Sequence, residues 1–112
     1  MAYEPDGQAW ALYDAEQPVG MLLLYDARRH PSKPASQLYL WRLLVDEAHQ
    51  GRGVGSQAVA WVQEEARRRG FDEVGLSHQD KPGHAGPFYR QLGFVYTGEV
   101  EDGEHKMLFK LR

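Results

Sequence analysis

Short runs of hydrophobic residues, separated by polar turns, organise the first half of this sequence. Apolar runs of this length, alternating or continuous, are typical of β-strands. The pattern predicts three strands, Gln8–Asp14, Val19–Ala27 and Gln37–Asp46. We expect a turn at Glu16-Gln17-Pro18 between the first two strands, and a surface loop over residues 28–36, where two prolines occur.

A helical period follows in the middle of the chain. Between Val54 and Arg69 the apolar residues recur at three- or four-residue spacing, which predicts one long amphipathic helix. The polar residues in its second half are expected to face water: Gln63, Glu64 and Glu65. Three arginines precede Gly70, and cations in a last turn followed by glycine favour a helix end there.

The remaining pattern completes a mixed α/β fold. We expect a strand at Glu73–His78, a short helix from Pro87 to Leu92 that Gly93 ends, and a terminal hairpin. The hairpin joins Phe94–Val100 to His105–Leu111 through an Asp102-Gly103 turn. The order is therefore β-β-β-α-β-α-β-β. The strands on either side of the long helix should be parallel, within a sheet that is otherwise mostly antiparallel.

Composition narrows the class of protein. Hydrophobic residues make up 42% of the chain, enough for one packed core, so we expect a single domain over residues 1–112. Cysteine is absent, which excludes disulfides, thiolate nucleophiles and cysteine-ligated zinc, and the pattern predicts no other metal site. The net charge of −3 argues against broad contact with nucleic acid. Apolar runs are too short to span a membrane, which favours a cytoplasmic protein.

The most informative segment is Gln50-Gly51-Arg52-Gly53-Val54-Gly55-Ser56, between a strand end and the long helix. Glycines at alternate positions remove side chains where the first helical N–H groups have no partner, which makes a pocket for phosphate oxygens. Arg52 would add a cation and Ser56 a hydroxyl. The plainer alternative is a tight turn that uses glycine only for steric freedom. The spacing fits neither a Walker loop nor a dinucleotide-binding turn.

Two motifs in this order resemble the GNAT superfamily of N-acetyltransferases. Gln50, Gly53 and Gly55 match its pyrophosphate-loop signature, Gln/Arg-x-x-Gly-x-Gly/Ala. Tyr89, with Gly93 and Phe94 after it, matches its second landmark, Tyr-x-x-x-Gly-Phe. The resemblance covers nearly the whole chain, from about Gln8 to Leu111, and implies a GNAT-like acyltransferase fold that uses acetyl-CoA.

The resemblance also implies roles for particular residues. Main-chain amides from Gln50 through Gly51, Arg52, Gly53 and Val54 to Gly55, with Ser56, would hold the pyrophosphate of coenzyme A. The strand residues Leu43, Leu44 and Val45 would pair with the pantetheine arm, and an amide near Leu44 would support the oxyanion. Tyr89 would protonate the departing thiolate. Judged without the family, Tyr89 is more simply a packed core tyrosine with a local hydrogen-bond partner.

Departures from the family pattern bear on the acceptor. The family's first strand and two helices have no counterpart in this sequence, and Pro82 stands where many relatives have asparagine. We therefore expect an apolar face or free edge on the early hairpin that favours a homodimer. Thr97-Gly98-Glu99 and the following hairpin resemble a branch that acetylates diamines and polyamines, so the acceptor is predicted to be a primary amine of a small molecule.

The base that takes the proton from this amine stays open. The candidates are Asp46, Glu47, His78 and His84, each of which is also explained as an ordinary surface or capping side chain. An acidic cluster could attract a polycation or serve only solubility: Glu99, Glu101, Asp102 and Glu104. Trp41 could line the acceptor pocket or pack in the core. The main alternative function is an acyl-CoA-binding module or partner subunit without turnover, and a third is an interaction protein whose glycines only shape a turn.

Overall fold

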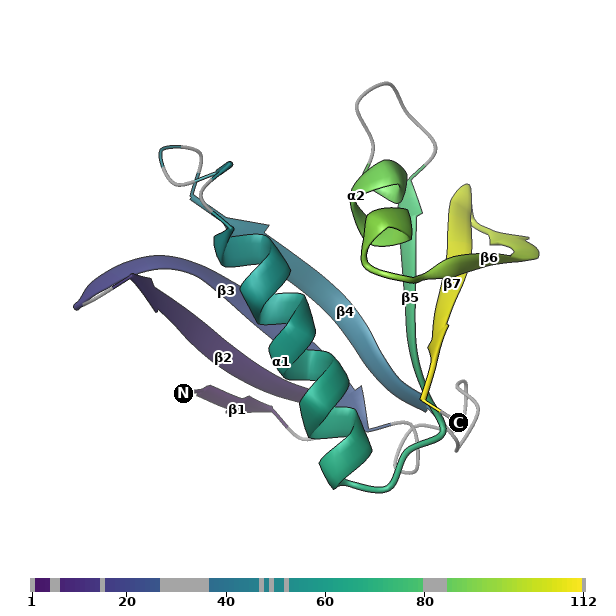
Figure 1. The fold of residues 1–112 in the computed structure, drawn as a ribbon, viewed down its shortest axis with the longest axis horizontal. Helices are drawn as coiled ribbons and strands as arrows, with labels where there is room; N and C mark the ends of the chain where they lie inside the picture. Colours follow the sequence, from purple (N-terminus) through teal and green to yellow (C-terminus); the bar gives the residue numbers. More distant parts are fainter. Residues whose placement is uncertain are drawn as a thin grey trace.

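A seven-stranded sheet forms the body of the protein, in the order β1-β2-β3-β4-β5-β7-β6 (Figure 1). The computed structural model describes residues 2–4, 7–14, 16–26, 37–46, 48, 50–51, 53–79 and 85–111. Seven strands and two helices lie within these residues: β1 (Ala2–Glu4), β2 (Gly7–Asp14), β3 (Gln17–Asp26), β4 (Gln37–Val45), α1 (Val54–Arg68), β5 (Glu73–Gln79), α2 (Gly86–Gln91), β6 (Val95–Glu101) and β7 (Glu104–Lys110).

The predicted mixed sheet is confirmed. Strands β4 and β5, which precede and follow α1 in the sequence, pair in parallel. The other neighbouring strands in the sheet are antiparallel. The turn between β6 and β7 places Asp102 at φ 53° and Gly103 at φ 78°, the left-handed pair that a two-residue hairpin turn requires. The short strand β1, which the sequence pattern did not predict, pairs with β2 at one edge of the sheet.

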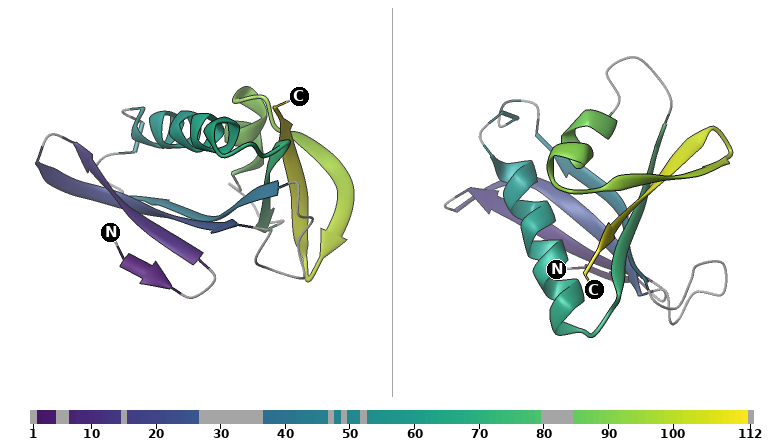
Figure 2. Two further views of the ribbon diagram at one scale, coloured as in Figure 1. Left: turned by 90° about the horizontal axis from the view of Figure 1, so that it is seen from below. Right: turned by 45° about the vertical axis from the view of Figure 1, so that its right-hand side comes forward.

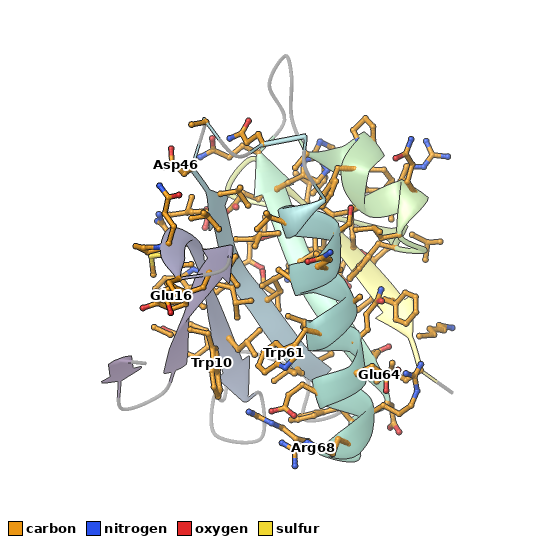
Figure 3. The ribbon with its side chains drawn as sticks, turned by 60° about the vertical axis from the view of Figure 1, so that its left-hand side comes forward. Trp10, Glu16, Asp46, Trp61, Glu64 and Arg68 are labelled. Carbon is orange, nitrogen blue, oxygen red and sulfur yellow. The ribbon has the colours of Figure 1, made fainter. Side chains whose placement is uncertain are left out.

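Both helices lie on the same face of the sheet (Figure 2). The buried stripe of α1 meets Leu22 and Leu24 of β3 and Leu38 and Leu40 of β4 in one hydrophobic core. At the edge of this core, Trp10 of β2 packs edge-on against Trp61 of α1, with ring centroids 5.0 Å apart (Figure 3). The far face of β3 and β4 has no helix over it in the described part of the chain.

Two local predictions are wrong. Glu65 was expected to face water, but it is 8% exposed and accepts hydrogen bonds from Arg68 and Arg69. The pairs that it forms offset the cost of burying a carboxylate, which a hydrophobicity pattern cannot register. Gln17 and Pro18 belong to β3 rather than to a turn, because Asp14 pairs directly with Gln17. In the described residues, no helix is both long and apolar enough to cross a membrane.

Candidate functional site

The turn before α1 depends on glycine. Gly51 and Gly53 have φ angles of 81° and 83°, in the left-handed region that other residues enter at a cost of about 1–2 kcal/mol. A Cβ atom added at either position would meet no atom within 4 Å. The backbone of this turn is therefore bare on its outer side, with room for a ligand to approach.

The first amides of α1 have no partner within the helix. Gly53 is the N-cap and supplies no side chain, and the described first turn contains no acidic residue. The first helical hydrogen bond runs from the Gln57 N–H to the Gly53 carbonyl, at 2.9 Å. The N–H groups of residues 54–56 precede this bond, so helix geometry gives them no partner within α1. Together with the helix dipole they form a positive site suited to phosphate.

The side chain of Gln50 holds this turn against the sheet. Its amide nitrogen donates to the carbonyl oxygen of Val45 at 3.1 Å, so the side chain ties the loop to the end of β4. The Asp46 N–H donates to the Val19 carbonyl at 2.6 Å and extends β4–β3 pairing to the same point. Asp46 itself is exposed at this end of the strand (Figure 3). Arg52 lies outside the described residues.

Strands β4 and β5 separate next to the glycine turn. Their pairing runs from Gln37↔Glu73 to Leu40↔Leu76 and ends there, although β4 continues to Val45 and β5 to Gln79. Figure 1 shows the two strands side by side where they begin and apart where they finish, beside the N-termini of both helices. We call the last paired rung, Leu40 with Leu76, the fork.

A β-bulge in β4 accompanies the separation. The register with β3 passes from Leu23↔Arg42 to Leu24↔Leu40, so Trp41 is an extra residue on β4. Bulges bend a strand and increase its twist, which turns the second half of β4 away from β5. Gly20 of β3, which pairs with Val45, allows β3 to approach β4 closely, because a Cβ on Gly20 would lie 2.2 Å from the Leu44 carbonyl oxygen.

Leu43, Leu44 and Val45 consequently have one backbone edge that no strand covers, and at its end the Val45 carbonyl accepts from the Gln50 side chain. On one side they pair with Leu22, Met21 and Gly20 of β3. On the other side, no residue of the described part of β5 pairs with them. Unpaired N–H and C=O groups along a strand edge bind an extended, amide-containing chain well.

Helix α2 places Tyr89 beside this region through its own C-terminal cap. The Gly93 N–H donates to Arg90 and the Phe94 N–H to Tyr89, each at 3.1 Å, with Gly93 at φ 98°. This is a Schellman motif, in which the residue after the glycine packs against the residue five positions earlier. The rings of Tyr89 and Phe94 make that contact, with centroids 5.6 Å apart. Before it, Phe88 packs against α1, 3.3 Å from a Cβ built on Gly55.

The Tyr89 side chain is buried, at 8% exposure. Burial raises the pKa of Tyr89 to about 12, because the site disfavours the phenolate. Among the described residues the structure gives its hydroxyl no hydrogen-bond partner. The ring of Tyr89 therefore packs in the core, as the simple expectation has it, and the phenol stays protonated at neutral pH.

The candidate bases are dispersed. His78 is buried at 7% exposure, with Nδ1 3.0 Å from the Gln79 carbonyl oxygen and Nε2 2.9 Å from the Tyr96 hydroxyl. Since a carbonyl only accepts, Nδ1 carries the proton and Nε2 accepts from Tyr96 in the neutral ring. Glu47 and His84 lie outside the described residues. Within the described residues, no three His, Asp or Glu side chains gather in a way that could hold a metal ion.

Sequence reasoning missed several residues that shape the site. Neither the bulge at Trp41 nor the close approach at Gly20 follows from the hydrophobic pattern, because both depend on neighbouring strands. Trp41, expected either in a pocket or in the core, is 45% exposed and contacts the ring of Tyr25, with centroids 4.8 Å apart. The glycine at position 20, within an otherwise apolar strand, is a signal that such a close approach occurs.

Comparison with known proteins identifies the family. The model of the acetyltransferase (GNAT) family matches residues 1–94, and this chain belongs to that family. N-acetyltransferase 8F1 of Rattus norvegicus is 31% identical over 93 residues, which cover 83% of this chain and 42% of the rat protein. The spermine/spermidine N(1)-acetyltransferase of Bacillus subtilis (strain 168) is 28% identical over 109 residues, which cover 96% of this chain and 65% of that protein.

Solved structures show the same fold. A Bacillus subtilis acetyltransferase crystallised in complex with CoA superimposes with a TM-score of 0.80 at 17% identity, covering 96% of this chain and 78% of that one. The present chain spans about two-fifths of the length of the rat relatives that it matches.

Proposed function

We propose that this chain binds acetyl-CoA and transfers the acetyl group to a primary amine of a small molecule, by direct attack within a ternary complex. The observation that carries the proposal is the bare glycine turn at the N-terminus of α1, which opens onto the unpaired edge of β4. A phosphate site and a strand edge that end at the same place suit a ligand with a pyrophosphate at one end and an amide-containing arm at the other.

The chain's residues divide the binding between them. In this proposal, the amides of Gly53, Val54, Gly55 and Ser56 hold the pyrophosphate, with Gln50 and Gly51 shaping the turn and Arg52 adding charge. The backbone of Leu43, Leu44 and Val45 binds the pantetheine arm as an added strand would be bound. An amide near Leu44 supports the oxyanion of the tetrahedral intermediate.

Tyr89 is proposed as the acid that protonates the leaving thiolate. Its burial keeps the phenol protonated, so the donor is present at every pH at which an acetyltransferase would work. The raised pKa also makes it a weaker acid than a free tyrosine, so proton transfer must coincide with cleavage of the C–S bond.

Calorimetric titration with coenzyme A and a thiol-release assay with a panel of amines test this proposal. Binding together with amine-dependent thiol release would support it. Binding without release for any amine would favour the alternative, an acyl-CoA-binding module or partner subunit without turnover. No binding heat would leave the glycines with only a structural role.

For the acceptor, we propose a polyamine. The similarity to a spermine/spermidine acetyltransferase supports this choice, as do the exposed carboxylates of Glu99 and Glu101 on the hairpin. Both carboxylates lie near the ammonium of Lys106, at 3.5 and 2.8 Å, and a polycation would compete with this lysine for them. The expected result of Glu99→Gln with Glu101→Gln is a higher KM for spermidine and an unchanged KM for a monoamine. An equal effect on both would refute the polyamine assignment.

We also propose a homodimer that forms through the early hairpin, β2 and β3, and leaves the exposed face of β4 uncovered. Tyr13 of β2, exposed at 61%, supplies surface on the hairpin that a second copy would bury. Sedimentation over a wide concentration range tests this, and a strictly monomeric profile would contradict it.

A further inference from the structure

In the described part of the chain, the face of the fork away from α1 has no helix over it. Leu38 and Leu40 of β4 and Leu76 of β5 face the core beneath α1, and Tyr89 belongs to the same core. The opposite face carries Trp41 and Leu44, which remain about half exposed. The inference rests on the proposed function. In it, the acceptor amine reaches the thioester from this face, and the proton of the amine leaves on the same face.

Three side chains on the open face form a continuous hydrogen-bonded chain across the sheet. Strand alternation turns Tyr39, Ser77 and Glu104 away from the core that holds their neighbours. The Tyr39 hydroxyl lies 2.9 Å from the Ser77 Oγ, and the Ser77 hydroxyl lies 3.4 Å from the Glu104 Oε1. A carboxylate only accepts, so Ser77 donates to Glu104, and its oxygen is free to accept from Tyr39.

The hydrogen-bonded series of Tyr39, Ser77 and Glu104 starts at the fork and ends at the surface. Tyr39 pairs with Gly75 one residue before the last paired rung, and its ring lies over that glycine, 3.3 Å from a Cβ built there. Tyr39 is 6% exposed, whereas Glu104 is partly exposed at the turn of the terminal hairpin. Leu40 to Val45 spans about 17 Å at the usual rise of a strand. An arm that enters beside Val45 from the pyrophosphate site thus brings its reactive end toward the fork.

We propose that the proton of the attacking amine leaves through Tyr39, Ser77 and Glu104. As the C–N bond forms, the nitrogen becomes positively charged and passes one proton to the Tyr39 oxygen. Tyr39 passes its own proton to Ser77, and Ser77 passes its own to the Glu104 carboxylate, which releases it to solvent. When the C–S bond breaks, the thiolate takes the Tyr89 proton. Glu104 releases one proton to solvent and the Tyr89 phenolate takes one up, so no net proton is released and the hydroxyls of Tyr39, Ser77 and Tyr89 are all restored.

The other titratable groups are less well placed. His78 shares its face with Leu76 and Met107 in the core, and both of its ring nitrogens have partners. Asp46 lies at the far end of β4, beside the glycine turn. The charged groups around Glu104 are Glu101, which faces it across the hairpin, Asp102 in the turn and Lys106 two residues along β7.

Matched variants test the relay. Ser77→Ala breaks it and Ser77→Thr keeps the hydroxyl in a residue that suits a strand. Glu104→Gln removes the carboxylate that accepts the proton at the end of the relay. Glu64→Gln, which removes an exposed carboxylate on α1, is the control. Thiol release is measured against pH for each protein, together with calorimetric affinity for coenzyme A and urea unfolding of the ligand-free proteins.

The relay predicts that Ser77→Ala and Glu104→Gln lower kcat roughly ten- to a hundredfold at neutral pH, as loss of a general base does. Glu64→Gln should retain the wild-type rate, and Ser77→Thr should restore most of the rate that Ser77→Ala loses. The deficit should shrink as pH rises, because hydroxide can then take the proton that the relay otherwise removes from the nitrogen. Affinity for coenzyme A should not change.

Three results would overturn the relay. The first is Glu104→Gln as active as Glu64→Gln, and the second is a deficit that is independent of pH. The third is loss of coenzyme affinity or folding stability in Ser77→Ala that Ser77→Thr does not restore, which would indicate a structural role only. Absence of thiol release from the wild-type protein, despite coenzyme binding, would refute the relay and the proposed transferase activity together.

Discussion

Replacing Tyr89 by phenylalanine removes one buried hydroxyl and keeps the ring that packs against Phe94. The pKa of this phenol is raised by burial to about 12, against 10.0 for an exposed tyrosine. A group whose pKa is raised on folding contributes fully below its unfolded pKa, and that contribution is lost as pH rises through the folded value. Tyr89 should therefore destabilise the fold progressively between pH 10 and pH 12.

The size of the effect follows from the shift. Two pKa units correspond to about 2.7 kcal/mol, and at pH 11 the two titration curves give a loss of about 1.4 kcal/mol. Urea unfolding of the wild-type protein and Tyr89→Phe at pH 8 and pH 11 measures it, because other groups that titrate at high pH are common to both proteins. The phenylalanine variant should gain about 1.4 kcal/mol relative to the wild type between these pH values.

Tyr13→Phe is the matched control, since Tyr13 is 61% exposed. A stability difference between the wild type and Tyr89→Phe that stays constant from pH 8 to pH 11 would refute the burial argument. It would mean that the phenolate is solvated in the folded protein and that Tyr89 is not kept protonated by its site.

Three further predictions concern the turn, the acid and a buried ion pair. Gly53→Ala should weaken coenzyme A binding more than tenfold in calorimetry, whereas Gly70→Ala, with a similar φ of 81° at the other end of α1, should cost similar stability and leave affinity unchanged. Tyr89→Phe should lower kcat about a hundredfold with little change in coenzyme affinity, and a wild-type rate would remove its acid role. Burial alone would raise the pKa of Glu65, but its two arginine partners outweigh this and lower it, so Glu65→Gln should cost about 1 kcal/mol at pH 7 and nothing well below pH 4.5.

The element order could be predicted from the sequence because each element obeys a local rule. The period of α1 and its Gly70 end are set within a few residues, and the structure confirms both with a Schellman motif, in which Phe71 N–H donates to Ala66. The same holds for the Asp102-Gly103 turn. Short β1 escaped prediction because three residues carry too little pattern to distinguish a strand from a tail.

Parts of the candidate site depend on distant neighbours and could not be predicted. The bulge at Trp41 is defined only by the register of β4 against β3. The burial of Glu65 depends on ion pairs with Arg68 and Arg69, one helical turn later. Tyr39, Ser77 and Glu104 come from three strands, with separations along the chain of 38 and 27 residues between bonded partners. Only the sheet order brings them together.

The signature formed by Tyr89, Gly93 and Phe94 serves folding as well as the proposed catalysis. The Tyr89 carbonyl accepts the bond from Phe94 that ends α2, and a Cβ on Gly93 would lie 2.8 Å from the Phe109 ring, so the motif is needed to build this corner of the protein. A descendant that had lost acetyl transfer would still keep the glycine and both aromatic rings in order to fold. Among the described residues the fold shows no bond to the phenolic oxygen, so under the proposed acid role this atom would distinguish a working enzyme from a silent relative.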